Sequence, residues 1–183
     1  MDGLLLRLLD DNRGAPAAWF WPCFEPLRAE FDKHYWIIEC QPWMGAPLAF
    51  HDPDGNNDTT VDDPRLNEEQ VQLWRPGSIS RWADDFGEES LDLWAVAGPE
   101  PIEVAVAYGR TRHDRQPEFV EKHAAFRLCY SDSCCWEIFA SEPEHLDLVR
   151  RYVAENASIR AYKTVSQNRR YGFSQIGWDS WPR

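Results

Sequence analysis

Alternating hydrophobic and polar residues dominate the second half of the chain and predict β-strands. Residues 91–97 and 102–108 alternate on either side of a turn that contains glycine and proline, which is typical of a β-hairpin. Residues 126–130 and 135–139 form a second such pair around a short polar turn, and residues 158–165 predict a final strand. Most of the predicted sheet therefore comes from this half.

Helical spacing of apolar residues predicts most of the remaining elements. The leucines of residues 4–9 predict a short amphipathic helix, and residues 26–33, with a proline near the start, predict one or two helical turns. Apolar residues recur at helical spacing over residues 79–86, with Ser78 as the candidate N-cap. Residues 141–153 begin with the spacing of a capping box and carry an apolar stripe that we expect to be buried.

These elements together predict an α+β protein. Residues 35–40, rich in β-branched and aromatic side chains, add a strand in the first half. Two hairpins, two further strands and several helices favour an antiparallel sheet of about five or six strands with helices packed on one face. A chain of 183 residues suits one well-filled core, and no linker interrupts it, so we predict a single domain over residues 1–183.

Charge is distributed unevenly along the chain. The formal net charge is −12, and residues 52–92 alone hold twelve acidic against three basic residues. Such a field repels nucleic acid and anionic lipid and attracts cationic proteins. We therefore expect neither a nucleic-acid nor a membrane partner. The simpler alternative, that the acidity only maintains solubility, stays open.

Aromatic rings lie among these carboxylates. Large aromatic side chains are favoured at interfaces, because they bury much area and lose few rotamers. A surface of rings and carboxylates suits a cationic protein, which charge steers into place and a few buried rings then hold. The predicted contact residues are Trp74, Trp82, Asp84, Asp85, Glu88 and Glu89, with Asp62 and Asp63 at the rim.

A calcium-dependent interaction module is one alternative. The loop that follows His51 resembles calcium-binding loops of the Asp-x-Asp-Gly type, since hard cations require about six to eight oxygen ligands from closely spaced groups. Its glycine comes earlier than in those loops, and the final ligand position holds an aspartate rather than a glutamate. The candidate ligands are Asp52, Asp54, Asn56, Asp58 and Asp63.

An enzyme or small-ligand-binding protein is the other alternative. Its candidate pocket lies near Trp136, Tyr108 and the arginines of residues 110–115, and Arg169 and Arg170 are further cations for an anionic ligand. The same arginines are equally suited to pairing with the acidic segment. The sequence contains no Gly-x-Ser-x-Gly motif and no recognisable Cys–His constellation, so we expect no catalytic residue and no cofactor.

Cysteine usage and the N-terminus indicate a compartment. The five cysteines form an odd count without the spacing of a disulfide framework or a zinc site. The N-terminal apolar run is too short for a signal peptide and contains Arg7, and no stretch approaches the roughly 20 apolar residues of a membrane span. We therefore expect a cytoplasmic protein with reduced thiols.

These properties together resemble a known class of proteins. A small, acidic, tryptophan-rich α+β protein without a catalytic motif is similar to the immunity proteins of bacterial polymorphic and contact-dependent toxins. The resemblance rests on the short helix of residues 79–86, the following hairpin with Trp94, and the acidic residues between 84 and 89. It implies a non-catalytic inhibitor that occludes the active site of a cognate, basic toxin.

Overall fold

One antiparallel sheet organises the chain. The computed structural model describes residues 1–9, 16–39, 59–86, 91–131 and 135–165, and within them seven strands pair in the order β3-β2-β4-β5-β6-β1-β7. The strands are β1 (Asp2–Leu8), β2 (Trp36–Glu39), β3 (Gln72–Trp74), β4 (Leu91–Val96), β5 (Ala124–Ser131), β6 (Cys135–Ala140) and β7 (Ile159–Val165). Every neighbouring pair is antiparallel.

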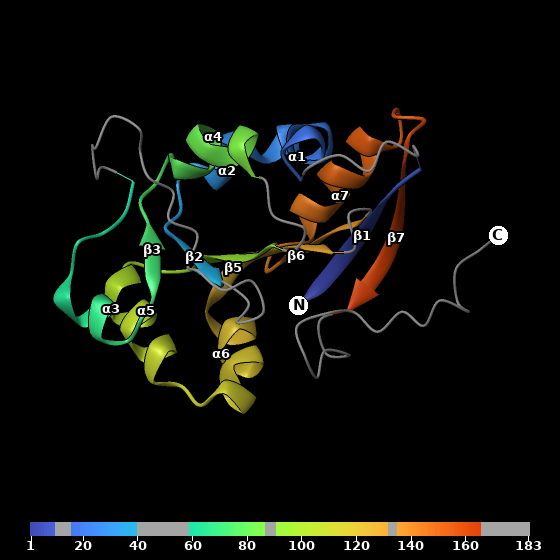
Figure 1. Ribbon diagram of the computed structural model, residues 1–183. Coiled ribbons are helices and arrows are strands. Elements are labelled where there is room, and N and C mark those ends of the chain that lie inside the picture. Colours follow the sequence, from blue (N-terminus) through green and yellow to red (C-terminus); the bar gives the residue numbers. More distant parts are fainter. Residues whose placement is uncertain (10–15, 40–58, 87–90, 132–134, 166–183) are drawn as a thin grey trace.

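Helices cover both faces of this sheet. They are α1 (Pro16–Phe24), η1 (Glu25–Leu27), α2 (Arg28–Phe31), α3 (Pro64–Glu68), α4 (Ser78–Trp82), η2 (Ala83–Asp85), α5 (Pro101–Arg110), η3 (His113–Arg115), α6 (Gln116–His123) and α7 (Pro143–Val153). In Figure 1, α1, α2, α4 and α7 lie above the sheet, and α3, α5 and α6 lie below it. The α+β class is confirmed, but the sheet has seven strands, and helices pack on both of its faces rather than on one.

Strand β1 forms where the sequence predicts a helix. It lies between β6 and β7, so neither of its edges is open. Leu4 and Leu6 enter the core on the upper face, while Leu5 is buried on the other. A continuous apolar run of this length is compatible with a strand buried on both faces as well as with a helix. Pairing with strands from the other end of the chain decides the outcome.

Helix α5 replaces the second strand of the first predicted hairpin. The alternation of residues 102–108 coexists with a helical stripe, because Ile102, Ala105, Val106 and Gly109 stand at spacings of three and four. Pro101 occupies the first turn of the helix, where its missing N–H costs no hydrogen bond. The partner of β4 is instead β5, and α5 and α6 connect these two strands.

Two predicted helix caps are corrected. Ser78 is the first residue of α4 rather than its N-cap, and its hydroxyl donates to the carbonyl of Thr59 at 3.3 Å. The N-cap is Gly77, whose φ of +83° is a conformation that glycine adopts without strain. Likewise, α7 begins after Glu142 without a side-chain cap, so Ser141 does not cap it.

The other predicted elements are confirmed. The helical turns of residues 26–33 appear as η1 and α2. The strand of residues 35–40 appears as β2, and the second predicted hairpin appears as β5 and β6. The final predicted strand is β7, which pairs with β1.

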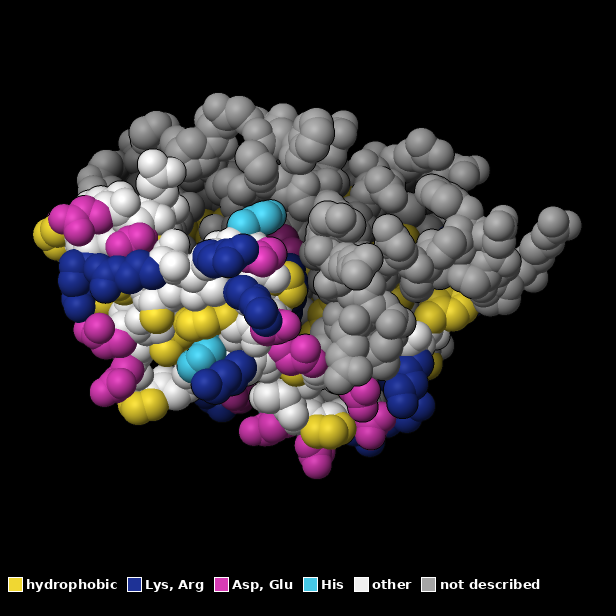
Figure 2. All heavy atoms as spheres, turned by 90° about the horizontal axis from the view of Figure 1, so that it is seen from below, with side chains coloured by type: hydrophobic (Ala, Val, Ile, Leu, Met, Phe, Trp, Pro, Cys, Tyr) yellow, Lys and Arg dark blue, Asp and Glu magenta, His cyan; other side chains and the backbone are white. Residues whose placement is uncertain are grey.

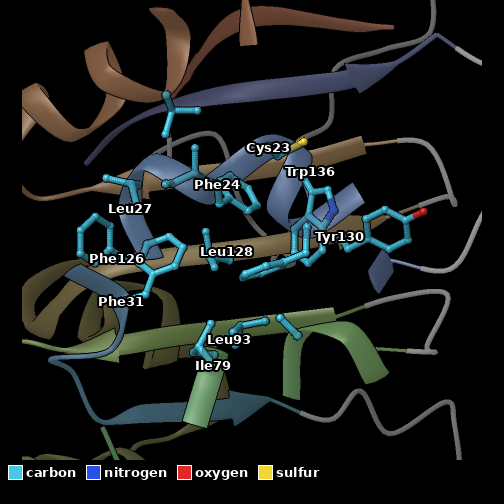
Figure 3. Packing of buried hydrophobic residues seen from close by; sticks show 14 of the residues in the cluster. Cys23, Phe24, Leu27, Phe31, Ile79, Leu93, Phe126, Leu128, Tyr130 and Trp136 are labelled. Atoms are coloured by element: carbon cyan, nitrogen blue, oxygen red, sulfur yellow. The ribbon is translucent and has the colours of Figure 1, made fainter. Parts of the chain in front are cut away.

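Aromatic side chains fill the space between the upper helices and the sheet (Figure 3). Phe20 and Phe24 of α1 meet Trp136 of β6 edge to face, with ring centroids 5.3 and 5.5 Å apart. Phe31 of α2 contacts Phe126 of β5 in the same way, at 5.1 Å. Each such pair contributes about 0.5–1.5 kcal/mol beyond the burial of its area. These contacts fix α1 and α2 over the centre of the sheet.

A second, smaller core lies on the lower face. Trp94 of β4 contacts Tyr108 of α5 with ring centroids 5.3 Å apart. Leu66 of α3 and Val120 of α6 belong to the same cluster. Its strand residues come from β2, β3, β4 and the start of β5, so the lower helices cover this end of the sheet.

Gly109 provides a test of how closely α5 packs. A Cβ atom at this position would lie 2.5 Å from Cβ of Glu69 and 2.9 Å from Cγ2 of Val71. Helix propensity alone favours alanine by about 1 kcal/mol, but overpacking costs about 1–3 kcal/mol. We expect Gly109→Ala to lower the free energy of unfolding in urea denaturation.

The exposed Ala107 of the same helix supplies the control for Gly109. There the reverse substitution, Ala107→Gly, should cost only the helix propensity of about 1 kcal/mol. A Gly109→Ala variant more stable than wild type would show that propensity outweighs the close approach of α5 to residues 69–71.

Candidate partner-binding surface

The two tryptophans predicted to contact a partner are buried, which corrects the prediction. Trp74 of β3 is 0% exposed, and Trp82 of α4 is 7% exposed. The indole N–H of Trp82 donates to Oγ1 of Thr59 at 2.9 Å inside the protein. Both rings belong to the upper core: Trp74 lies on a strand of the sheet, and the apolar side of α4, which carries Trp82, turns toward that sheet. Neither ring is offered to a partner.

The acidic residues of the predicted surface are divided between two sides of the molecule. Asp84, in η2, is exposed on the upper side with α4. Asp62 and Asp63 precede α3, which packs on the lower face. The sheet therefore separates them, and they do not form one surface. The side chain of Asp85 lies outside the described part of the chain, as do Glu88 and Glu89, whose roles stay predictions.

Asp63 has a structural role at the start of α3. Its carboxylate accepts the backbone N–H of Arg65 at 2.9 Å and the Arg65 guanidinium at 2.9 Å. The Arg65 side chain also donates to Glu103 of α5 at 2.8 Å. Hydrogen bonding to Arg65 lowers the pKa of Asp63 below its ordinary value. This carboxylate is engaged within the protein.

The described residues provide no calcium-binding site. Four of its candidate ligands, Asp52, Asp54, Asn56 and Asp58, lie outside them. The fifth, Asp63, caps α3. Among the residues that the structure describes, no group of three or more His, Cys, Asp or Glu side chains is placed to hold a metal ion.

The proposed aromatic and arginine pocket is not assembled either. Trp136 belongs to the upper core and Tyr108 to the lower one, so the sheet separates them. Each of the three arginines already pairs with a carboxylate of this chain: Arg110 with Glu69 at 2.8 Å, Arg112 with Asp114 at 3.1 Å, and Arg115 with Glu118 at 2.9 Å. On the face seen in Figure 2, acidic and basic side chains accordingly alternate. Arg169 and Arg170 lie outside the described residues.

The described cysteines are buried and reduced. Cys23, Cys129 and Cys135 are free thiols. Burial raises the pKa of the Cys23 thiol, which lowers its reactivity because the thiolate is the nucleophile. Cys23 packs among the aromatic residues of the upper core (Figure 3).

An open groove runs between α1 and the turn that follows α7. It has a volume of about 550 Å³ and combines aromatic, polar and acidic side chains. Its lining residues are Trp21, Pro22, Glu25, Tyr152, Glu155, Asn156 and Ala157. The predicted burial of the α7 stripe is correct for Leu146, Val149 and Val153 but wrong for Tyr152, which is 39% exposed.

One of the two exposed large hydrophobic side chains in the described part of the chain lines this groove. Among the described residues, the exposed large hydrophobic side chains are Tyr152 and Leu9, the latter 44% exposed. Leu9 follows β1, and its N–H donates to the carbonyl of Ser158 at 2.8 Å. Ser158 comes directly after Ala157 of the groove wall. The backbone of Leu9 is therefore paired with the residue that follows the groove wall, and Tyr152 is the exposed large hydrophobic side chain of the groove itself.

Charge at the groove comes from Glu25 and Glu155. The Glu25 carboxylate accepts hydrogen bonds from Arg28, and the Arg28 guanidinium lies 3.6 Å from the centroid of the Trp21 ring. Hydrogen bonding to Glu25 raises the pKa of Arg28 above its ordinary value, and the charge of Asp84 adds to the effect. The groove thus places carboxylates beside aromatic rings. One of these carboxylates, that of Glu25, already binds the Arg28 guanidinium.

A row of buried polar residues crosses the lower face of the sheet. Arg127 of β5 donates to both carboxylate oxygens of Asp92 of β4, with Nε 2.9 Å from Oδ1. The Cys129 thiol donates to the same carboxylate at 3.3 Å, and Glu137 of β6 stands opposite Cys129. These four residues are 2–7% exposed. Asp92, the last acidic residue of the segment 52–92, is therefore neutralised inside the protein rather than displayed.

No known protein family, curated protein or solved structure matches this chain. Within the described residues, no helix combines the length and apolarity needed to cross a bilayer. Function is therefore inferred from geometry and charge alone.

Sequence patterns contain only part of the signal for the groove. Trp19, Trp21 and Pro22 lie in an aromatic segment that packs around the buried Phe20, so Trp21 does not stand out as a surface residue. Tyr152 has the helical phase of a core position. Its hydroxyl and its place at the end of α7 are the features that favour a position at the surface.

The buried pair of Arg127 and Asp92 should be essential for stability. Arg127→Met leaves a buried carboxylate without its main partner, and such a loss costs about 3–5 kcal/mol. We expect this decrease in the free energy of unfolding, measured with guanidinium chloride. The double variant Asp92→Asn/Arg127→Met is the control and should recover part of the loss. A single variant that unfolds with wild-type energetics would contradict the assignment.

Proposed function

We propose that this protein is a non-catalytic inhibitor of a basic bacterial protein toxin, which it binds in the cytoplasm and whose active site it occludes. The observation that carries this proposal is the groove beside α1, where the exposed Tyr152 ring, the partly buried Trp21 ring and two carboxylates stand together on a chain with a net charge of −12. The groove replaces the surface around Trp74 and Trp82 as the contact site.

Charge and rings have separate tasks in such an inhibitor. The net negative charge accelerates encounter with a basic protein, because attraction acts before contact. The rings of Trp21 and Tyr152 supply area that becomes dry on binding, which slows dissociation. Glu25 and Glu155 offer acceptors to lysine or arginine side chains at the edge of that area.

A protein suits this groove better than a small molecule. Its volume of about 550 Å³ lies within the range of about 300–1,000 Å³ that is usual for ligand pockets. Ligand pockets enclose most of the surface of their ligand, whereas this groove is open to solvent. A side chain or loop that projects from a larger partner fits an open groove, because the rest of the partner excludes water around it.

Co-expression tests the function directly. Each open reading frame that flanks the gene is expressed in a laboratory bacterium, alone and together with this chain. We expect one flanking product to arrest growth alone and this chain to restore growth. If no flanking product arrests growth, or if co-expression leaves the arrest unchanged, the toxin-inhibitor proposal is wrong.

Tyr152→Ala tests the groove as the contact surface. We expect the toxin found by co-expression to bind this variant at least about tenfold more weakly, which is about 1.4 kcal/mol. The measurement is isothermal titration calorimetry. The free energy of unfolding should fall by no more than about 2 kcal/mol, because 39% of the Tyr152 side chain is already exposed.

Two charge-matched variants of the α7 region separate the groove from general acidity. Glu155→Gln removes a carboxylate that lines the groove, whereas Glu144→Gln removes an exposed one from the first turn of α7. Only the first should weaken binding beyond the effect of net charge. An unchanged dissociation constant for both Tyr152→Ala and Glu155→Gln would move the contact surface elsewhere while the growth rescue still stood.

A further inference from the structure

We infer that Arg28, which does not itself line the groove, is an internal competitor for the Trp21 ring and the Glu25 carboxylate of its wall, and that the partner group with which it competes is an arginine side chain. This inference rests on the proposed function, since it specifies which cation of the partner the groove receives. Arg28 contacts two lining residues, Trp21 and Glu25. These are the two contacts, a salt bridge with a carboxylate and stacking on an indole ring, that an arginine of a partner would make.

The geometry of Arg28 is that of a bound guanidinium. Its Nη2 atom donates to Oε2 of Glu25 at 2.7 Å, and its Nε atom lies 3.0 Å from Oε1. Its Cζ atom lies 3.6 Å from the centroid of the Trp21 ring. A two-pronged contact with a carboxylate combined with stacking on an indole ring uses both properties that distinguish guanidinium from ammonium. The assignment to arginine rather than lysine follows from this geometry.

The contact is also replaceable. The Arg28 and Glu25 side chains are 39% and 46% exposed, and water competes strongly with ion pairs of that kind. A partner arginine that arrives with a larger surface gains additional contacts, so it can displace Arg28 from Glu25. The free protein therefore keeps Glu25 neutralised and one face of Trp21 covered until a partner arrives.

Electrostatics predicts the direction of the effect. Arg28 interacts with Glu25 and, at longer range, with Asp84 and Asp32. Without its guanidinium, these three carboxylates attract an external cation more strongly. Removal of Arg28 should thus tighten the binding of arginine.

The experiment compares full-length variants by isothermal titration calorimetry at one fixed ionic strength. The ligands are a capped tetra-arginine peptide and a tetra-lysine peptide of equal charge. We expect Arg28→Ala to bind tetra-arginine at least about fivefold more tightly than wild type, with a smaller gain for tetra-lysine. Adding Glu25→Gln to Arg28→Ala should abolish the gain.

Arg150→Ala is the matched control. Removal of Arg150 changes the net charge by the same amount, but Arg150 pairs on α7 with Asp147, which does not line the groove, at 2.9 Å. It should change the affinity by less than about twofold at moderate salt. If Arg28→Ala and Arg150→Ala bind tetra-arginine with equally increased affinity, the increase comes from the change in net charge, and the proposal that Arg28 competes with a partner arginine is wrong. Equal gains for the two peptides would overturn the assignment to arginine.

Arg28→Lys is a second variant, for use if Arg28→Ala does not fold stably. If Arg28→Ala lowers the melting temperature enough to prevent titration, Arg28→Lys keeps the charge and loses the two-pronged contact. It should then show a smaller gain in the affinity for tetra-arginine, and no gain overturns the competition. If Arg28 variants have no effect while Tyr152→Ala still weakens toxin binding, the competition is wrong and the proposed function stands.

Discussion

Covering both faces of the sheet is the constraint on which the rest of this structure depends. The central strands are apolar on the upper face, and burying a large aromatic side chain contributes about 1.5–3 kcal/mol. The chain therefore uses its aromatic residues first as core. Four tryptophans are 0% exposed and are divided between the two faces: Trp36, Trp74, Trp94 and Trp136. These buried tryptophans thus belong to two cores rather than to one binding surface.

The groove forms at the edge of the layer of helices that covers the upper face of the sheet. α1 and α7 lie beside each other above the sheet (Figure 1), and the turn after α7 meets the side of α1 that carries Trp21. Rings at this border are amphipathic, because one part packs on the core while another part meets water. Tyr152 is left exposed at this border. A rim of this kind provides apolar area without weakening the core beneath it.

The acidity of the chain acts mainly at long range. Many carboxylates are already paired, for example Glu69 with Arg110 and Asp92 with Arg127, and others lie on opposite sides of the sheet. Among the described residues between 59 and 92, no single patch collects the negative charge. A diffuse negative field still steers a basic partner, whereas local rings and a few carboxylates decide where it docks. Within the groove, the pair of Glu25 and Arg28 sets how much negative charge a partner meets.

Local sequence determines what depends on neighbours in the chain, and tertiary structure decides the rest. Periodicity and turn chemistry were sufficient for the α+β class, the hairpin of β5 and β6, strand β7 and the amphipathic α7, because each pattern is complete within its own segment. They were insufficient for β1 and α5, whose patterns fit helix and strand alike until distant partners chose between them. They also could not place Trp82 inside, separate Asp62 from Asp84, or bring Trp21 to Tyr152. Such contacts form when segments far apart in the sequence pack together, and a pattern within one segment does not predict which other segment it will contact.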